Sequence, residues 1–185
     1  MKKLLAIAMI AGSLITSVFA QERETLNNVN LVIPVRNASG STKGIGVDWH
    51  GFTFKNSSFG ILTGCSFWIP LDLLSNSSGG AYAFDLDGTF GASFKVLDTD
   101  MFSAILSAGV TINMFDVMDF LYEFDFGVCA DACVNFKLFD DFYITGGVQF
   151  NYYFYSYALI PGYAGAGGNE GITTIAPRIG VTFVE

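Results

Sequence analysis

Residues 84–102 read Phe-Asp-Leu-Asp-Gly-Thr-Phe-Gly-Ala-Ser-Phe-Lys-Val-Leu-Asp-Thr-Asp-Met-Phe, and residues 124–142 repeat the pattern as Phe-Asp-Phe-Gly-Val-Cys-Ala-Asp-Ala-Cys-Val-Asn-Phe-Lys-Leu-Phe-Asp-Asp-Phe. In each copy, apolar residues alternate with small or polar ones up to a Phe-Lys pair, aspartates follow, and an aromatic residue restarts the alternation. A weaker third copy lies at residues 54–59. The lysines of the three copies, Lys55, Lys95 and Lys137, are 40 and 42 residues apart. Alternation is the period of a β-strand, and this repeat length fits two strands with their connections. The repeat predicts side-by-side hairpins in an all-β, antiparallel up-and-down architecture.

The first 20 residues of the 185-residue chain have the pattern of a cleavable signal peptide. Lys2 and Lys3 precede an apolar run at 4–10, and small residues lead up to Ala20. A basic start, an apolar centre and a small-residue end predict export with cleavage after Ala20. The expected organisation is a signal peptide at 1–20, a polar lead-in at 21–28 and one barrel domain at 29–185.

The charge of the exported chain excludes one class of partner. Without Lys2 and Lys3, seven of the nine basic residues remain against 17 acidic ones, so the net charge is near −10. A chain this acidic repels phosphate backbones, and we expect no nucleic-acid partner.

The three cysteines give no evidence for a disulfide. Cys129 and Cys133 lie four residues apart on one expected strand, roughly 13 Å between Cα atoms, which is too far for a bond. Cys65 has no evident partner, and we expect neither a cofactor nor a metal.

Eight alternating segments follow the lead-in. They are 29–37, 44–55, 59–69, 81–95, 101–114, 120–138, 142–157 and 172–184. Short polar connections at 56–58, 96–100 and 139–141 alternate with mostly longer ones, which places the short turns and both chain ends at one end of the molecule. Transmembrane β-barrels alternate short periplasmic turns with longer outer loops in this way.

The aromatic residues are expected to form two girdles on the outer face. Tyr82 and Phe94 are twelve residues apart, roughly 40 Å along a strand or about 30 Å along the axis of a tilted barrel, which is enough to cross a membrane. The lower girdle, next to the short turns, would comprise Phe54, Phe59, Phe94, Phe102, Phe136, Phe142 and Phe183. The upper girdle would comprise Trp49, Trp68, Tyr82, Tyr122, Tyr152 and Phe154. Such rings mark membrane–water interfaces, since aromatic side chains prefer the headgroup level.

On these features, residues 29–185 resemble the small eight-stranded outer-membrane β-barrels, the class of outer membrane proteins X and W and of the membrane domain of outer membrane protein A. The resemblance depends on the signal peptide, strand number, turn alternation and girdles. It implies a bacterial outer-membrane location, insertion by the barrel-assembly machinery, contact with outer-membrane lipids and a monomeric state. Pro34 and Pro177 would lie in the first and last strands, where a proline cannot donate to the ladder, so a closed barrel should have fewer hydrogen bonds at this seam.

The inward faces are expected to bring acidic side chains together in the upper lumen. This polar cluster would contain Asp85, Asp87, Glu123 and Asp125, with Arg36 and Arg178 as counter-charges. A satisfied polar core is the favoured interpretation, because small barrels are filled by side chains. A divalent-cation site or a charged gate is the alternative.

His50 is the single histidine, and we expect it near Asp48 at the outer rim, with a bulge at Gly51 so that Phe52 and Phe54 face lipid. With the serines of the 75–78 run, His50 suggests a lipid A acyl-modifying enzyme as a minor alternative. A soluble periplasmic barrel that binds a small apolar ligand is another, and it requires apolar faces that point inward. The favoured prediction is a non-enzymatic outer-membrane barrel with a filled or very narrow lumen and a structural, minor-conduit or surface-exposed role.

Overall fold

The computed structural model describes residues 24–38, 40–55, 58–71, 83–117, 121–160, 165–169 and 171–185. The expected signal peptide lies outside the described residues. The strands are β1 (Glu24–Val32), β2 (Val35–Asn37), β3 (Ser41–Phe54), β4 (Phe59–Pro70), β5 (Ala83–Asp98), β6 (Phe102–Val117), β7 (Leu121–Phe139), β8 (Phe142–Leu159), β9 (Ala166–Gly168) and β10 (Ile172–Val184). No helix in these ranges is long and apolar enough to cross a bilayer.

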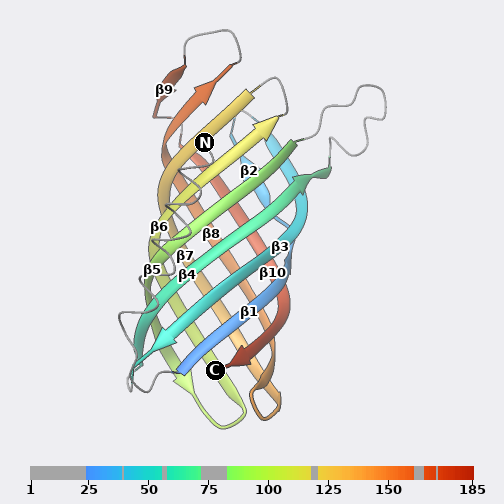
Figure 1. Cartoon of the computed structure of the whole chain (residues 1–185), viewed down its shortest axis with the longest axis vertical. Coiled ribbons are helices and arrows are strands. Elements are labelled where there is room, and N and C mark those ends of the chain that lie inside the picture. Colours follow the sequence, from blue (N-terminus) through green and yellow to red (C-terminus); the bar gives the residue numbers. More distant parts are fainter. Residues whose placement is uncertain are drawn as a thin grey trace.

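The strands form a closed antiparallel barrel, as the sequence predicts. β1 and β2 are two halves of one barrel strand, because both pair with β3 on one side and with β10 on the other. Every other neighbour pair in the ring consists of consecutive barrel strands, and β10 also pairs with β8. The ring therefore contains eight strands, and the short β9 pairs antiparallel with the upper end of β8 (Figure 1).

The seam between the first and last barrel strands is closed but interrupted. β1 pairs with β10 from Leu26↔Val184 to Val32↔Arg178, and pairing resumes in β2 beyond Pro34. Across the gap, the Ile33 N–H donates to the Pro177 carbonyl at 3.1 Å. The Pro34 carbonyl accepts from the Gly44 N–H at 2.9 Å. Pro34 therefore breaks the strand without opening the wall.

The first strand begins earlier than the sequence pattern suggested. Glu24 already pairs with Phe54, so residues 24–28 of the expected lead-in belong to the barrel wall. Asn27 and Asn28 lower the apolar content there, so a prediction based on hydropathy did not include these residues in the strand.

The two sequence repeats have the same backbone irregularity. The ladder register shifts between Lys95 and Leu97 in β5, and between Lys137 and Phe139 in β7. Each shift is a β-bulge directly after the repeated lysine, and the extra residue turns two consecutive apolar side chains outward. The hairpins therefore match in three dimensions as well as in sequence.

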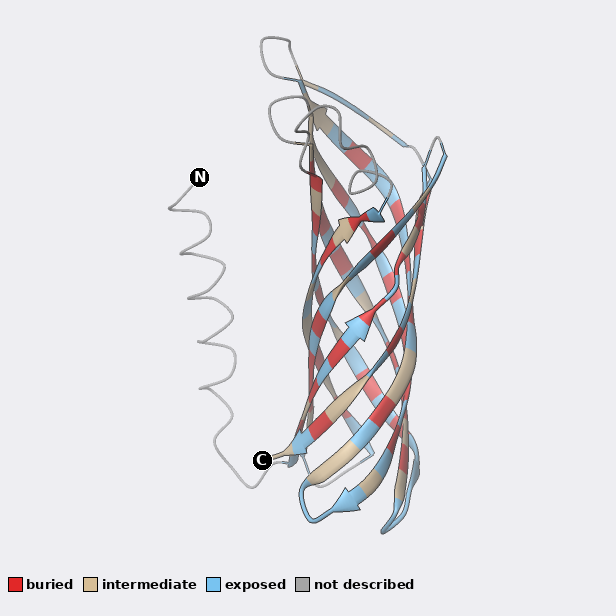
Figure 2. Cartoon of the chain, turned by 90° about the vertical axis from the view of Figure 1, so that its right-hand side faces the viewer, coloured by how far each residue is buried: buried red, intermediate tan, exposed pale blue. Residues whose placement is uncertain are grey.

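The strand faces divide the side chains between outside and lumen. Phe90, Leu106 and Val128 are 46%, 51% and 47% exposed on the outer surface. The polar residues that alternate with them are buried, which gives the banded pattern of Figure 2. Apolar residues thus form the outer surface, and this contradicts the alternative of a soluble barrel with an apolar interior face.

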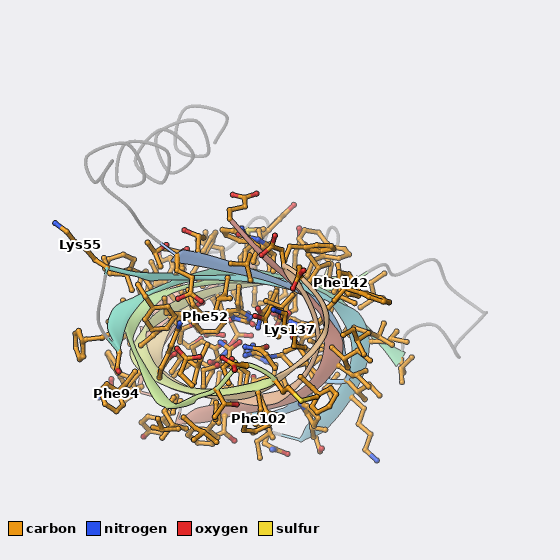
Figure 3. The ribbon with its side chains drawn as sticks, turned by 90° about the horizontal axis from the view of Figure 1, so that it is seen from below. Phe52, Lys55, Phe94, Phe102, Lys137 and Phe142 are labelled. Carbon is orange, nitrogen blue, oxygen red and sulfur yellow. The ribbon has the colours of Figure 1, made fainter. Side chains whose placement is uncertain are left out.

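Three aromatic residues were assigned to the wrong face. Phe52, Phe54 and Trp68 are 0%, 1% and 1% exposed and point into the lumen, and Figure 3 shows Phe52 inside the ring. The pairing of β3 with β4 is continuous through Gly51, so the expected bulge there does not exist. An uninterrupted strand that turns Asp48 and His50 inward must turn the second and fourth residues after His50 inward as well.

Candidate functional site: the polar lumen

Arg36 of β2 lies at the centre of the upper lumen network. Its guanidinium donates to Asp125 at 2.8 Å and lies 3.3 Å from Glu123 and 4.0 Å from Asp85. These carboxylates project from β5 and β7, which are not neighbours of β2 in the ring. The contacts therefore cross the lumen, and Arg36 itself is only 3% exposed.

Aromatic rings and amides complete the surroundings of this cluster. Arg36 lies over the rings of Phe115 and Tyr153, at 5.2 and 5.9 Å from their centroids. The Tyr153 hydroxyl of β8 donates to Asp87 of β5, and the Asn113 amide donates to Asp85. Each of the four expected acidic residues thus has a partner, and all four lie within one network around Arg36.

Arg178 of β10 forms a second cluster. Its guanidinium lies 2.5 Å from Asp131, 3.5 Å from Asp48 and 2.6 Å from His50 Nδ1. Asp48 also accepts from the Asn30 amide at 2.6 Å. Arg178 therefore belongs to this cluster and not to the upper cluster, where the sequence had placed it as a counter-charge.

The position of His50 differs from the expected one. The side chain is 1% exposed, and it contacts Arg178 from inside the barrel wall. An outer-rim location for His50 is therefore wrong. The serine run at 75–78 lies outside the described residues.

A layer of uncharged hydrogen bonds adjoins the second cluster. The Thr182 hydroxyl donates to Asn28 Oδ1 at 2.7 Å and lies 3.1 Å from Asn135 Oδ1. Asn135 also accepts from Thr145 at 2.7 Å and donates to Ser103 at 3.1 Å. The donors and acceptors come from β1, β6, β7, β8 and β10, so this layer also ties separate parts of the ring together.

The lumen also contains an apolar cluster. It consists of Leu26, Phe52, Phe54, Leu62, Ile105, Cys129 and Cys133. Lys95 lies 4.6 Å from the Phe54 ring centroid and forms ion pairs with Glu24 and with Asp98, the second at 3.2 Å. Cys129, Cys133 and the outward-facing Cys65 are free thiols.

Negative charge is in excess within the two charged clusters. Six carboxylates, namely Asp48, Asp85, Asp87, Glu123, Asp125 and Asp131, share Arg36 and Arg178. One or both oxygens of Asp85, Asp125 and Asp131 make no hydrogen bond. Even so, within the described ranges no group of three or more acidic, His or Cys side chains is arranged to hold a metal.

The other expected girdle residues lie on the outer surface where they are described. In the lower girdle these are Phe59, Phe94, Phe102, Phe136, Phe142 and Phe183, and Phe142 packs edge-on against Phe183 at 5.2 Å between centroids. In the upper girdle they are Trp49, Tyr122, Tyr152 and Phe154. Tyr82 lies outside the described residues. Figure 3 shows Phe94, Phe102 and Phe142 around the outside of the ring.

Solved structures with the same architecture come from several bacteria. Neisserial surface protein A superposes with a TM-score of 0.63 at 11% identity, over 88% of this chain and 99% of that one. A major outer membrane protein of Thermus thermophilus gives 0.53 at 10% identity, over 86% and 99% of the two chains. OprG of Pseudomonas aeruginosa gives 0.50 at 11%, over 88% and 95%.

The fold is that of the small outer-membrane β-barrels. No protein-family model matches the sequence, and no curated protein matches it at a significant level. At these identities the likeness establishes the architecture alone, and it does not carry a binding property from one protein to another.

Part of the barrel's charged network was not predicted from the sequence. Asp131, Asp48 and Tyr153 hold or extend the two clusters, yet none was singled out as a cluster member. Strand parity was the available signal: Asp131 has the same parity as Asp125 on β7, and Tyr153 follows Asn151 by two residues on β8. Tyr153 was not predicted to face the lumen, because the aromatic residues of this chain were assigned to the lipid face as a group.

Proposed function

We propose that this protein is an integral protein of the bacterial outer membrane that acts without catalysis and whose lumen is filled by its own side chains. Its role is structural within the envelope, with outer-membrane lipids as its surroundings and the barrel-assembly machinery as its partner during insertion. It acts as a monomer and uses no cofactor.

The outer surface supports the membrane location. Large apolar side chains such as Val110, Ile112 and Ile179 are more than half exposed, which is costly in water and favourable in hydrocarbon. The aromatic residues at both ends of this apolar surface suit the two headgroup regions. A closed ring also leaves no strand edge unpaired in lipid.

The contacts across the lumen are the observation that carries the filled-lumen proposal. Arg36 joins β2 to β5 and β7, and Arg178 joins β10 to β3 and β7. A hydrated path for ions would have to separate these buried pairs. The network of cross-lumen pairs therefore favours the closed state.

Planar-bilayer recording tests the proposal. The exported chain, folded and inserted, is expected to give no current steps above leak. Regular single-channel steps would contradict the filled lumen and would favour the second candidate, a minor conduit. The excess of carboxylates indicates that such a conduit would select cations, so reversal potentials in a salt gradient would identify it.

The enzyme alternative needs His50 at the outer rim, and the contact of His50 with Arg178 inside the barrel does not support it. A His50→Asn variant tests what remains of it. We expect cells that carry the variant to have an unchanged lipid A acylation pattern, and a changed pattern would restore the alternative.

A further inference from the structure

The upper lumen contains more buried acid than its cation can balance. The Arg36 guanidinium lies within 4.0 Å of three carboxyl groups, those of Asp85, Glu123 and Asp125. Asp87 adds a fourth carboxyl to the same network. Asp85, Asp87 and Asp125 are 1%, 4% and 0% exposed, so three buried carboxyl groups share one guanidinium. A buried carboxylate without a counter-charge takes up a proton rather than stay ionised.

Asp85 and Asp87 form the pair in which such a proton would be shared. They lie two residues apart on the inward face of β5, and their side chains are within hydrogen-bonding reach of each other. Two ionised carboxylates cannot form a hydrogen bond, because both can only accept. Two like charges at this separation also oppose each other's ionisation. The pair is therefore complete only when one member carries a proton.

The hydrogen-bond partners distinguish the two members of the pair. Asp87 accepts from the Tyr153 hydroxyl and, at 3.4 Å, from the Ser66 hydroxyl, which suits a carboxylate. Asp85 accepts from the Asn113 amide through Oδ1, whereas its Oδ2 is buried and makes no hydrogen bond. A proton on this Oδ2 turns an acceptor that lacks a donor into a donor. Asp87 is an acceptor within its reach.

We propose that the upper lumen is a proton-binding site, in which Asp85 is protonated at neutral pH and donates to the Asp87 carboxylate. The proton supplies the positive charge that Arg36 alone does not provide. Its release would add a negative charge to the buried pair and weaken the contacts that close the lumen. The inference deepens the proposed filled lumen and depends on it, because water in an open lumen would solvate both carboxylates.

The other groups that face the pair do not replace this proton. Cys129 of β7 and Tyr153 of β8 lie near Asp87 and are neutral when protonated. Glu123 and Asp125 of β7 add negative charge. β4 and β6 present the hydroxyl and the amide described above, and β2 presents the single guanidinium.

Infrared spectroscopy of the full exported chain, folded in an uncharged detergent without carbonyl groups, tests the proposal. The C=O stretch of a protonated carboxyl is separate from the carboxylate bands, and aspartate labelled with carbon-13 identifies it. We expect the parent chain to show this band at neutral pH and Asp85→Asn to lose it. In Asp87→Asn the band should vanish or shift, because the acceptor of the proton has changed.

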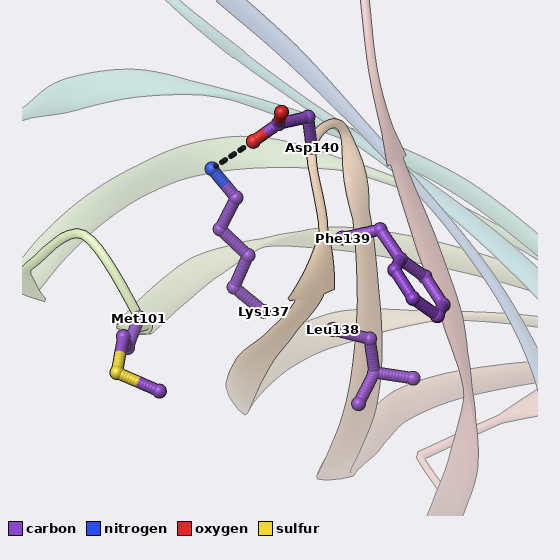
Figure 4. Close-up of a pocket in the computed structure, with 5 residues that line it drawn as sticks. All are labelled: Met101, Lys137, Leu138, Phe139 and Asp140. Atoms are coloured by element: carbon purple, nitrogen blue, oxygen red, sulfur yellow. Dashed lines mark ion pairs between the residues drawn. The ribbon is translucent and has the colours of Figure 1, made fainter.

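Asp140→Asn is the matched control. Asp140 pairs with Lys137 at the β7–β8 turn at 3.0 Å, and its side chain is 96% exposed (Figure 4). The same chemical change there removes an acid that lies in water, so the band should stay. Absence of the band from the parent chain, its survival in Asp85→Asn, or an unshifted band in Asp87→Asn would overturn the proposal. Bilayer recording tests the filled lumen separately, so the two failures are distinguishable.

The pH dependence of unfolding by urea in vesicles gives a second readout. An unfolded aspartate releases its proton above about pH 4, whereas the folded chain keeps the proton on Asp85. Where the folded state binds one more proton, the folding equilibrium constant falls by up to about tenfold for each unit of rising pH. Asp85→Asn should remove this contribution between about pH 5 and neutrality, and Asp140→Asn should not. Equal slopes in the parent chain and Asp85→Asn would contradict the bound proton.

Discussion

Two arginines organise the charged lumen at the scale of single residues. Arg36 and Arg178 each bring together carboxylates from strands that are not their neighbours. Alternation in the sequence was sufficient to place Asp85, Asp87, Glu123 and Asp125 on inward faces. It could not pair each arginine with its own acids, because pairing depends on the stagger of the ring and not on parity.

Replacement of Arg36 by Met should destabilise the barrel strongly. Methionine keeps an unbranched stem but lacks the guanidinium, so three nearby carboxylates lose their cation, and we expect a loss of about 3–5 kcal/mol in the free energy of unfolding. Urea unfolding in phosphatidylcholine vesicles, followed by tryptophan fluorescence, measures it. The exposed Lys55→Met change should cost less than about 0.5 kcal/mol, and a similarly small loss for Arg36→Met would contradict the role given to Arg36.

Gly64 makes room for His50. A Cβ on Gly64 would contact the His50 ring and approach Thr89 Oγ1 to 2.8 Å, whereas a Cβ on the outward-facing Gly146 meets nothing within 4 Å. We expect Gly64→Ala to destabilise the barrel by about 1–3 kcal/mol. Gly146→Ala should be neutral or slightly stabilising in the same unfolding assay. Equal effects of the two changes would show that the packing around His50 is loose.

At the scale of elements, the hairpin repeat was the most reliable feature of the sequence. It gave the strand order and the positions of the short turns, and the strand ends agree to within a few residues apart from the start of β1. Phe54 and Trp68 were predicted to face lipid but are buried in the lumen. A large aromatic ring on a strand can pack equally well against lipid or in a filled interior, so the residue type alone does not decide the face. Only the continuous register of β3 with β4 decides between these faces.

The β7–β8 turn contains one strained position. Asp141 has φ +62°, in the left-handed region, whereas Asp140 does not. Asp141→Gly should therefore raise the free energy of unfolding by up to about 1 kcal/mol. Asp140→Gly is the matched control and should lower it slightly, since it gains no such relief and loses the ion pair with Lys137. A loss in stability for Asp141→Gly would mean that its side chain contributes more than the strain costs.

At the scale of the whole molecule, the barrel's interior is polar over much of its volume and its exterior is apolar. Binary alternation predicted this arrangement, because parity assigns every second residue to one face. The apolar lumen cluster could not be predicted in this way, since it breaks the rule that inward residues are polar. It forms where Leu26, Phe52 and Ile105 meet across the ring.

A charged side chain in the central part of the lipid-facing surface should destabilise the barrel. Val128 is an outward residue of β7 with 47% exposure, and Val128→Lys is expected to cost about 2–4 kcal/mol for a side chain near the bilayer midplane. Unfolding in vesicles gives the value, and Val128→Ala controls for lost apolar area. If lysine cost no more than alanine, this face of β7 would not be in contact with hydrocarbon.

The seam extends to the last residue of the chain. The Glu185 N–H donates to the Thr25 carbonyl, and the Thr25 N–H donates back to the Glu185 carbonyl, both at 2.9 Å. Positions 25 and 185 are therefore immediate neighbours, and a short linker could join them in a circular permutant. If the chain were then cut in one of its longer connections, every strand would keep its partners although a different strand would be synthesised first.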